Sequence, residues 1–429
     1  MLLRLFVSIL ALAAPAWAAA APSQVRIVQQ DGVYVLHVDG QPFRVKGAGM
    51  GGEGQEELAA RGGNSFRTWR TGMDEVKVRA MLDRAQRNGL KVAMGIEVGN
   101  ERQGFDYDDR AAVERQRERI RREVALYKDH PAVLMWVVGN ELNLHCRNPK
   151  VWNAVGALAD TIHEEDPHHP VMTTLAGFDH ALIDLLKARA PSLDLIGVQL
   201  YGDIGALPEK LADSGWTGPY VVTEWGPTGH WESPLTTWKA PVEDDASRKA
   251  QLLQQRYEQV IAADTTQGLG SYVFLWGNKQ ERTPTWYGLF LPTGESTPAV
   301  DAMQYVWTGA WPANRAPSIR PLRLDGRLAT DSVVLAPGAS YAAQVEAQDA
   351  DGDALTYHWT VLHESTATSI GGDREDVPAQ VALAMQEDGR GGLVLVAPDA
   401  PGAYRLFVEV HDGHGHAAYA NLPFRVAAR

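Results

Sequence analysis

Two glutamates, Glu141 and Glu224, each stand at the end of an apolar, strand-like run of residues. Glu141 closes the run 132–141, and Glu224 closes the run 219–224. In a parallel α/β barrel the carboxyl ends of all strands open onto one face, so residues far apart in the sequence meet there. Two carboxylates that meet in this way can break a glycosidic bond, one as a proton donor and the other as a nucleophile.

These two roles need different surroundings. Glu141 must hold a proton near neutral pH, and both burial and the charge of Glu224 would raise its pKa. Glu224 must stay ionised, for which Arg67 is the candidate cation and Tyr201 a candidate hydroxyl donor. Arg70 competes with Arg67 for this role, and Tyr201 is equally well explained as a core residue with a satisfied hydroxyl.

The elements that would carry these residues alternate between strand and helix. Apolar runs predict strands at 43–49, 65–70, 90–98, 133–138, 171–175, 193–201, 220–223 and 272–276. Helical periodicity predicts helices at 75–88, 109–127, 151–165, 179–190 and 247–263. Eight strands with helices between most of them predict an α/β fold, a (β/α)8 TIM barrel. The hairpin around Asp39-Gly40 is expected to plug the bottom of this barrel.

The pattern changes near residue 312. From there on the apolar residues alternate with period two, and Gly, Asp and Pro separate the runs, which predicts a small all-β sandwich over residues 313–429. The Pro-rich junction at Pro312–Pro317 suggests that few contacts cross between the two parts, so the sandwich is expected to fold independently.

Four motifs in the barrel region carry a family resemblance. They are His130–Glu141 with Gly139-Asn140-Glu141, then Thr223–Gly226, Gly63–Arg67, and Trp276. Together, in this order, they resemble clan A glycoside hydrolases, families 2 and 5 being the most similar. The resemblance covers roughly residues 43–310.

The resemblance implies a retaining enzyme with Glu141 as acid/base and Glu224 as nucleophile. It further implies that Asn140 binds the sugar 2-hydroxyl and that Trp276 forms a flat platform for the sugar ring, with Trp231 and Trp286 as rivals. An equatorial, β-linked substrate follows, with β-glucan or β-mannan as leading candidates. Endo or exo action stays open.

In the C-terminal part, Asp349, Asp351 and Asp353 lie in a stretch that resembles PKD and cadherin-like Ig-type modules. Three alternate acids could bind calcium, but a solvated turn is the favoured interpretation because Asp-Gly turns are common between strands. We assign no metal and no cofactor, since no cluster has zinc-like spacing and no Gly-rich phosphate loop follows a strand.

Composition, net charge and cysteine content limit which partners the protein can have and which cellular compartment it occupies. Residues 1–18 have the positive start, apolar stretch and Ala-Trp-Ala end of a secretory signal, so we expect export to the periplasm or beyond, without stable membrane insertion after cleavage. The net charge of −13 argues against nucleic acid and polyanionic glycans. The single cysteine, Cys146, excludes an internal disulfide and is interpreted as a half-buried thiol. The oligomeric state is open.

Two other functions stay open beside hydrolysis. A transglycosylase would use the same residues and pass the sugar to a hydroxyl group instead of water. A catalytically inactive glycan-binding protein of the cell envelope is the rival from another class, and the intact pair Glu141 and Glu224 argues against it.

Overall fold

The computed structural model describes residues 21–428. The expected signal segment, residues 1–18, therefore lies outside the described residues. No helix in the described part is long and apolar enough to span a bilayer.

Eight parallel strands close into a barrel in the order β10-β11-β4-β5-β6-β7-β8-β9, which confirms the predicted TIM barrel. Their residues are almost all buried, because helices cover the outside and side chains fill the inside. The strands are β4 (Val45–Gly49), β5 (Ser65–Arg67), β6 (Lys91–Ile96), β7 (Val133–Val138), β8 (Val171–Ala176), β9 (Leu195–Gln199), β10 (Tyr220–Trp225) and β11 (Gly268–Val273).

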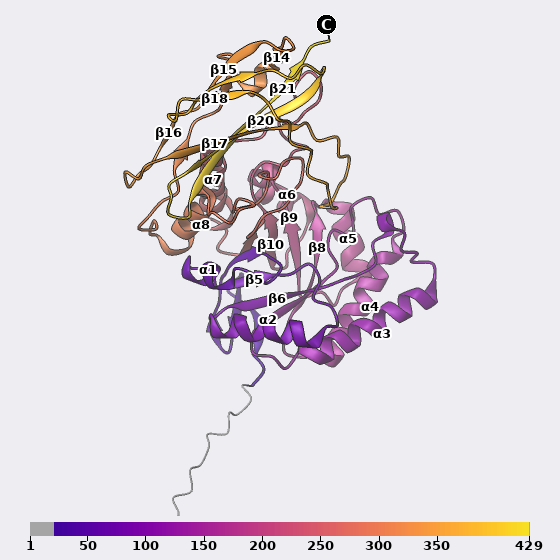
Figure 1. Cartoon of the computed structure of the whole chain (residues 1–429). Helices are drawn as coiled ribbons and strands as arrows, with labels where there is room; N and C mark the ends of the chain where they lie inside the picture. Colours follow the sequence, from indigo (N-terminus) through magenta and orange to yellow (C-terminus); the bar gives the residue numbers. More distant parts are fainter. Residues whose placement is uncertain (1–20, 429) are drawn as a thin grey trace, which may run out of the picture.

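Helices surround this barrel (Figure 1). The clearest sequence pattern belongs to α3, which buries Ile120, Val124 and Tyr127 on one face. This helix begins after Asp109, whose side chain accepts hydrogen bonds from two backbone amides of the first turn. The helices are α1 (Gln55–Ala60), α2 (Glu75–Arg87), α3 (Arg110–Tyr127), α4 (Lys150–Glu165), α5 (His180–Arg189), α6 (Leu207–Ser214), α7 (Ala246–Arg256) and α8 (Pro298–Thr308). Shorter turns are η1 (Glu101–Gln103), η2 (Gly202–Ala206), η3 (Tyr257–Ile261) and η4 (Ala329–Asp331).

A small antiparallel sheet closes the amino-terminal end of the barrel. It consists of β1 (Val25–Gln30), β2 (Val33–Val38) and β3 (Gln41–Pro42). Leu36 and Val38 of this sheet share one apolar cluster with barrel residues such as Leu134 and Val221. The candidate site residues are therefore expected at the opposite, carboxyl-terminal face.

The C-terminal β-region, residues 313–428, is built from two four-stranded sheets, β13-β15-β19-β18 and β14-β21-β20-β17, and the short pair β12-β16. The predicted all-β character is confirmed, while the Ig-like classification stays a prediction. The strands are β12 (Ser318–Ile319), β13 (Arg323–Leu324), β14 (Val334–Leu335), β15 (Ser340–Gln344), β16 (Ala347–Gln348), β17 (Thr356–His363), β18 (Met385–Glu387), β19 (Gly392–Val396), β20 (Gly402–His411) and β21 (Ala417–Val426).

The expectation that few contacts join the two parts is wrong. Figure 1 shows the C-terminal β-region as a layer against one end of the barrel. The buried ammonium of Lys249, on α7, donates to Glu243 at 2.5 Å and to the hydroxyl of Tyr419, on β21, at 3.1 Å. Asn421 donates to the same Glu243 at 2.6 Å, and Arg405 donates to the carbonyl of Pro241 at 2.7 Å. Buried polar groups that hydrogen-bond across a boundary tie its two sides together, because separation would remove these partners.

Candidate active site

The polar residues predicted for the site gather at the carboxyl ends of four barrel strands. Arg67 ends β5, Asn140 and Glu141 follow β7, Tyr201 follows β9, and Glu224 lies next to the last residue of β10. The structure therefore brings together five of the six residues singled out in the sequence.

The backbone turns sharply where Glu141 leaves β7. Gly139 has a φ of +74°, and a Cβ atom there would lie 2.6 Å from Cδ1 of Leu142, so only glycine fits. Glu141 itself has a φ of +51°, a conformation that residues with a side chain rarely adopt. Such strain persists where the surroundings hold it and is common at functional sites. Here it projects the carboxyl group of Glu141 from the end of the strand.

The carboxylate of Glu224 accepts hydrogen bonds from three donors. Its Oε1 accepts hydrogen bonds from Nη1 of Arg67 at 2.9 Å and from Nε1 of Trp69 at 2.7 Å, and its Oε2 accepts one from the hydroxyl of Tyr201 at 3.1 Å. Burial and the charge of Glu224 raise the pKa of Tyr201, which keeps its hydroxyl protonated and donating. The register between β9 and β10 shifts at Glu224, an irregularity of the kind that redirects a side chain at a barrel rim.

Hydrogen bonds to its amide oxygen orient the side chain of Asn140. Oδ1 accepts hydrogen bonds from Arg67 at 2.7 Å, Gln199 at 2.9 Å and Thr174 at 3.2 Å. An amide whose oxygen is surrounded by donors must present its NH2 group elsewhere. Asn140 is partly exposed, so this NH2 group is available to a substrate hydroxyl.

The pKa of Glu141 is raised to about 8, first because the surrounding protein removes water from the carboxyl group and second because Glu224 carries a like charge nearby. The charges of Arg67 and Arg102 oppose this shift. At pH 7 Glu141 is therefore mainly protonated, whereas Glu224 has a cation and two other donors around it. This separation of roles is what a pair of acid and nucleophile requires.

Aromatic rings line the site, but Trp276 is not among them. Phe274 packs against Trp69, Tyr201 and Tyr287 with ring centroids 5.7, 6.1 and 5.7 Å apart. The role of Trp276 as a sugar platform stays a prediction, but its ring does not pack in this group, whereas that of Phe274, the first residue after β11, does.

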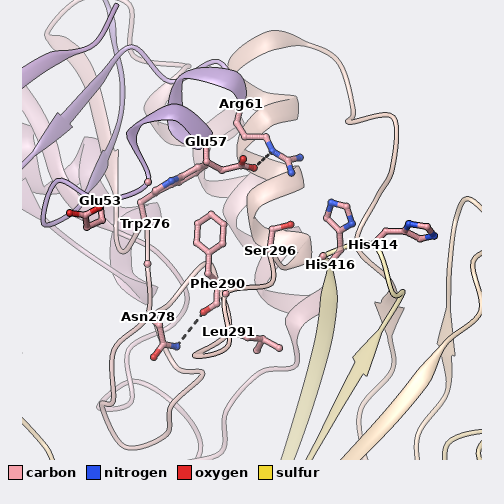
Figure 2. Close-up of a pocket in the computed structure, with 14 residues that line it drawn as sticks. Glu53, Glu57, Arg61, Trp276, Asn278, Phe290, Leu291, Ser296, His414 and His416 are labelled. Atoms are coloured by element: carbon pink, nitrogen blue, oxygen red, sulfur yellow. Dashed lines mark hydrogen bonds and ion pairs between the residues drawn. The ribbon is translucent and has the colours of Figure 1, made fainter. Parts of the chain in front are cut away.

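Trp276 faces the helical layer instead. It is only 4% exposed, and its ring packs against Phe290 at 5.3 Å and Trp307 of α8 at 5.9 Å. It borders a separate cavity of about 620 Å³, shown in Figure 2, on whose other side lie His414 and His416 of the C-terminal β-region. The physical reason is that β11 ends at Val273, so strand alternation no longer sets the direction of the side chain at 276.

The structure also distinguishes between the residues that competed for a role in the sequence. Arg70 is exposed and pairs with Glu97 at 3.7 Å, so Arg67 is the cation at Glu224. Trp231 is 59% exposed and packs edge-on against Tyr201, whereas Trp286 is buried and donates to the carbonyl of Thr228.

Cys146 is half-buried, as expected, and burial together with Glu101 raises the pKa of its thiol to about 11. A thiol with a raised pKa carries little of the reactive thiolate near neutral pH, which argues against a nucleophile here.

Sequence reasoning missed Trp69, Phe274 and Gln199. The signal for Trp69 was present, because positions 65, 67 and 69 lie on one face of an extended segment and Arg67 was already assigned to that face. Gln199 lies in an almost wholly apolar run, where one polar residue at a strand end is an equivalent signal.

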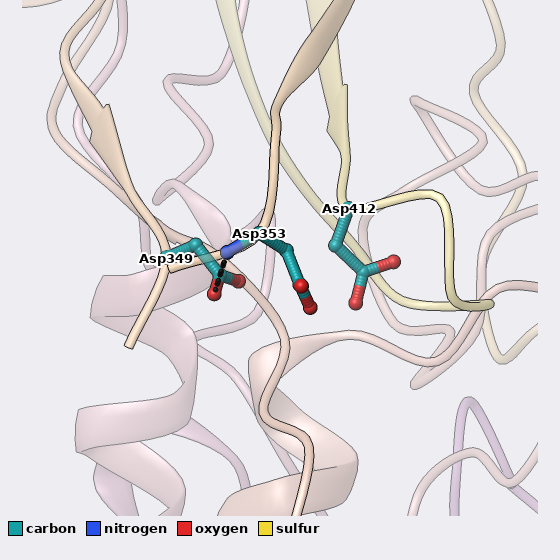
Figure 3. Close-up of side chains that lie close together, drawn as sticks. All are labelled: Asp349, Asp353 and Asp412. Carbon is teal, nitrogen blue, oxygen red and sulfur yellow. Dashed lines mark hydrogen bonds between the residues drawn. The ribbon is translucent and has the colours of Figure 1, made fainter. Parts of the chain in front are cut away.

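The three aspartates of the C-terminal motif do not converge. Oxygens of Asp349, Asp353 and Asp412 lie within 4.8 Å of one another. Figure 3 shows these three side chains close together. Asp351 instead accepts a hydrogen bond from the amide of Arg315 at 2.8 Å. Oδ1 of Asp349 accepts from the amides of Asp351 and Asp353, which is ordinary turn geometry. Asp412 joins the group from a distant strand end, which the local spacing could not reveal.

Comparison with known proteins supports the fold. A family model described as glycosyl hydrolases family 2, TIM barrel domain, matches residues 73–228. No curated protein matches the chain.

Similar solved structures include a Bacteroides uniformis β-glucuronidase (TM-score 0.50, 14% identity, 94% of this chain and 48% of that one). They also include a Bifidobacterium dentium β-glucuronidase in complex with coumarin-3-O-glucuronide (TM-score 0.52, 18% identity, 67% of this chain and 49% of that one). A putative β-galactosidase from Bacteroides fragilis is similar as well (TM-score 0.51, 13% identity, 94% of this chain and 57% of that one). The chain thus spans about half the length of the first solved structures that it matches. At these identities the likeness concerns the fold: a closed barrel of the glycoside hydrolase type, whose central part is similar to the family 2 TIM barrel domain.

Proposed function

We propose that this protein is a retaining β-glycoside hydrolase that uses Glu224 as nucleophile and Glu141 as acid/base. The observation that carries the proposal is the contrast between the two carboxyl groups. Glu141 has a pKa raised to about 8, and Glu224 accepts hydrogen bonds from Arg67, Trp69 and Tyr201.

The proposed reaction has two steps. In the first, Glu224 forms a bond to the anomeric carbon while the glycosidic C–O bond breaks, and Glu141 gives its proton to the leaving oxygen. In the second, Glu141 takes a proton from water, the water oxygen bonds to the anomeric carbon, and Glu224 is released. The NH2 group of Asn140 would donate to the sugar 2-hydroxyl, a contact that strengthens as positive charge develops on the ring.

The proposed substrate is a neutral β-linked glycan, β-glucan or β-mannan in type, because the chain carries a net charge of −13. The similar solved structures are named β-glucuronidase and putative β-galactosidase, so both sugars belong among the glycosides that are tested. We also propose that residues 1–18 direct export, as their composition indicates.

The test is a panel of 4-nitrophenyl β-glycosides (glucoside, mannoside, galactoside and glucuronide) with purified protein. We expect turnover of at least one of them, and a loss of several orders of magnitude in kcat for Glu224→Ala, because no covalent intermediate can form. Glu141→Ala should still release nitrophenol in the first step, and azide should restore its turnover as a β-glycosyl azide. Glu101→Gln, an acid outside the pair, is the control.

Wild-type protein that turns over none of these glycosides, nor β-glucan or β-mannan oligosaccharides, would contradict the proposal and favour an inactive glycan-binding protein. Products longer than the substrate would indicate transglycosylation instead of hydrolysis.

A further inference from the structure

A segment of the C-terminal β-region leaves its sheet and reaches the barrel mouth. This bridging segment, residues 364–378, begins after β17 and returns beside it. The amide of His363 donates to the carbonyl of Ala379 at 3.0 Å, and Leu362 pairs with Gln380. Because its two ends are already adjacent, a turn of a few residues would connect them, so sheet formation does not explain the length of the segment.

One side of the bridging segment binds the loops after β6 and β7. Asp373 accepts two hydrogen bonds from the guanidinium of Arg102, at 2.7 and 3.1 Å. Gly371 lies against the side chain of Leu144, which follows Glu141 by three residues. A carboxylate–arginine pair with two parallel bonds fixes orientation as well as position.

The other side binds the loop after β11. Lys279 donates to the carbonyl of Gly372 at 2.8 Å, and its ammonium also lies 5.9 Å from the ring centre of Phe274. The buried carboxylate of Glu375 accepts from the amide of Arg282 at 2.6 Å and pairs with its guanidinium at 3.1 Å. The pair of Arg282 and Glu375 is largely shielded from water, so it holds the segment more firmly than an exposed ion pair would, whereas the bond from Lys279 to Gly372 is exposed.

The two anchor points lie on opposite sides of the mouth. In the barrel order β11-β4-β5-β6-β7-β8-β9-β10, strands β11 and β7 are four places apart in a ring of eight. Gly371 contacts the loop after β7 and Gly372 the loop after β11, so the segment crosses between them. The charges of Arg102 and of Glu281, which neighbours Arg282, both act on the pKa of Glu141, so the crossing lies close to the reacting groups.

We propose that the bridging segment is a fixed wall across the active-site mouth and determines the length of glycan that the site accepts. A continuous chain cannot pass through a cleft that is closed on one side, so cleavage is confined to chain ends or short oligosaccharides. This inference rests on the proposed function, and it gives the C-terminal β-region a part in substrate selection.

The test replaces residues 366–376 by Gly-Ser-Gly-Ser, which keeps Glu364 and its buried pairing with Arg405. Soluble β-mannan and soluble β-glucan are the probes, and the fall in viscosity is compared with the number of reducing ends released. Wild-type protein should release reducing ends with little loss of viscosity. The replacement should raise the viscosity loss per released end about tenfold, equivalent to lifting a steric cost of about 1.4 kcal/mol on internal binding.

A second variant protects the test against misfolding of the first. Asp373→Asn combined with Glu375→Gln weakens both anchors without shortening the chain, and it should shift the same ratio in the same direction. Arg390→Ala, at an exposed turn of the same β-region, is the matched control and should leave the ratio at the wild-type value.

The inference would be overturned by a steep viscosity loss with wild-type protein, or by an unchanged viscosity loss per released end in both variants. Glu224-dependent hydrolysis would still support the proposed function in that case. Absence of Glu224-dependent cleavage of every glycoside would overturn both.

Discussion

At the scale of single residues, the account depends on how five polar side chains share their hydrogen bonds. Arg67 is the centre of this arrangement, since its guanidinium donates to both Glu224 and Asn140 and so fixes the proposed nucleophile relative to the residue proposed to bind the sugar. Among residues 21–428 no such donor reaches the carboxyl group of Glu141, and its surroundings favour the neutral acid. The two glutamates differ because of their neighbours, and the neighbours can be changed one at a time.

The pH dependence of activity should follow Glu141. Because its pKa is raised to about 8, kcat/KM on a glycoside with a poor leaving group should fall as the pH rises above about 8, where the proton is lost. In Glu224→Gln the like charge is gone, so the pKa of Glu141 should fall. Carbon-13 NMR of labelled glutamate, with Glu141→Gln to assign the signal, measures this directly. An identical pKa in both proteins would show that Glu224 does not act on Glu141.

Phe274, and not Trp276, should be the aromatic residue that contacts the sugar. Phe274→Leu should lower kcat/KM about tenfold, because an aromatic contact contributes about 0.5–1.5 kcal/mol beyond burial, and it should change Tm little. Trp276→Ala should cost about 3–5 kcal/mol of stability by leaving a cavity beside Phe290 and Trp307, with activity per folded molecule retained. Thermal unfolding and kinetics of both variants test this, and the reverse pattern would restore Trp276 as the platform.

The sequence was most informative about residues at strand ends. Glu141, Glu224, Arg67 and Asn140 could be placed because strand period and strand order decide which end and which face they occupy. Trp276 could not, because it lies beyond the last paired residue of β11, where the path of the chain depends on tertiary contacts.

At the scale of elements, the barrel strands position the site and their irregular ends aim its side chains. Strand β7 matches its predicted range fully, since its six apolar residues follow Pro131 and Ala132 and end directly before Gly139, which leaves little choice. The sequence did not reveal helices α1 and α6 because each is short. It did not reveal α8 because few charged residues on its outer face mark the helical period, although Thr297 and Pro298 are good start signals for a helix.

The turn at Gly139 should be essential for activity beyond its effect on stability. Gly139→Ala places a Cβ atom against Leu142 and strains a positive φ, so Glu141 should be displaced and kcat should fall by about a hundredfold, as expected for a misplacement of roughly 1 Å. Gly89→Ala is the matched control, because Gly89 also has a positive φ, of +68°, but has open space around it and lies far along the chain from the site residues. It should lower Tm and leave kcat unchanged. Equal activity of the two variants would contradict a positioning role for the turn.

At the scale of the whole molecule, the C-terminal β-region is joined to the barrel by buried hydrogen bonds and by the ion pair between Arg282 and Glu375. Period-two patterns predicted that its strands have apolar faces, but such patterns cannot say what covers those faces, and the Pro-rich junction suggested independence. The structure instead places Lys249, Glu243 and Tyr419 in one buried network across the boundary.

A chain ending at residue 312 should therefore be insoluble or strongly destabilised. In the full chain, Lys249→Met should cost about 3–5 kcal/mol, because it leaves Glu243 buried without its cation. The yield of soluble protein and the Tm of both proteins provide the measurement. A soluble truncated chain with wild-type Tm would show that the barrel does not need the β-region.

The central claim concerns which glutamate bonds to the sugar, and trapping the intermediate tests it most directly. A 2-deoxy-2-fluoro β-glycoside matching the preferred sugar forms the glycosyl-enzyme and slows its hydrolysis. Mass spectrometry of the digested protein should find the added sugar on the peptide that contains Glu224, and NMR should show the first-formed product with retained configuration. An adduct on Glu141, or an inverted product, would contradict the account.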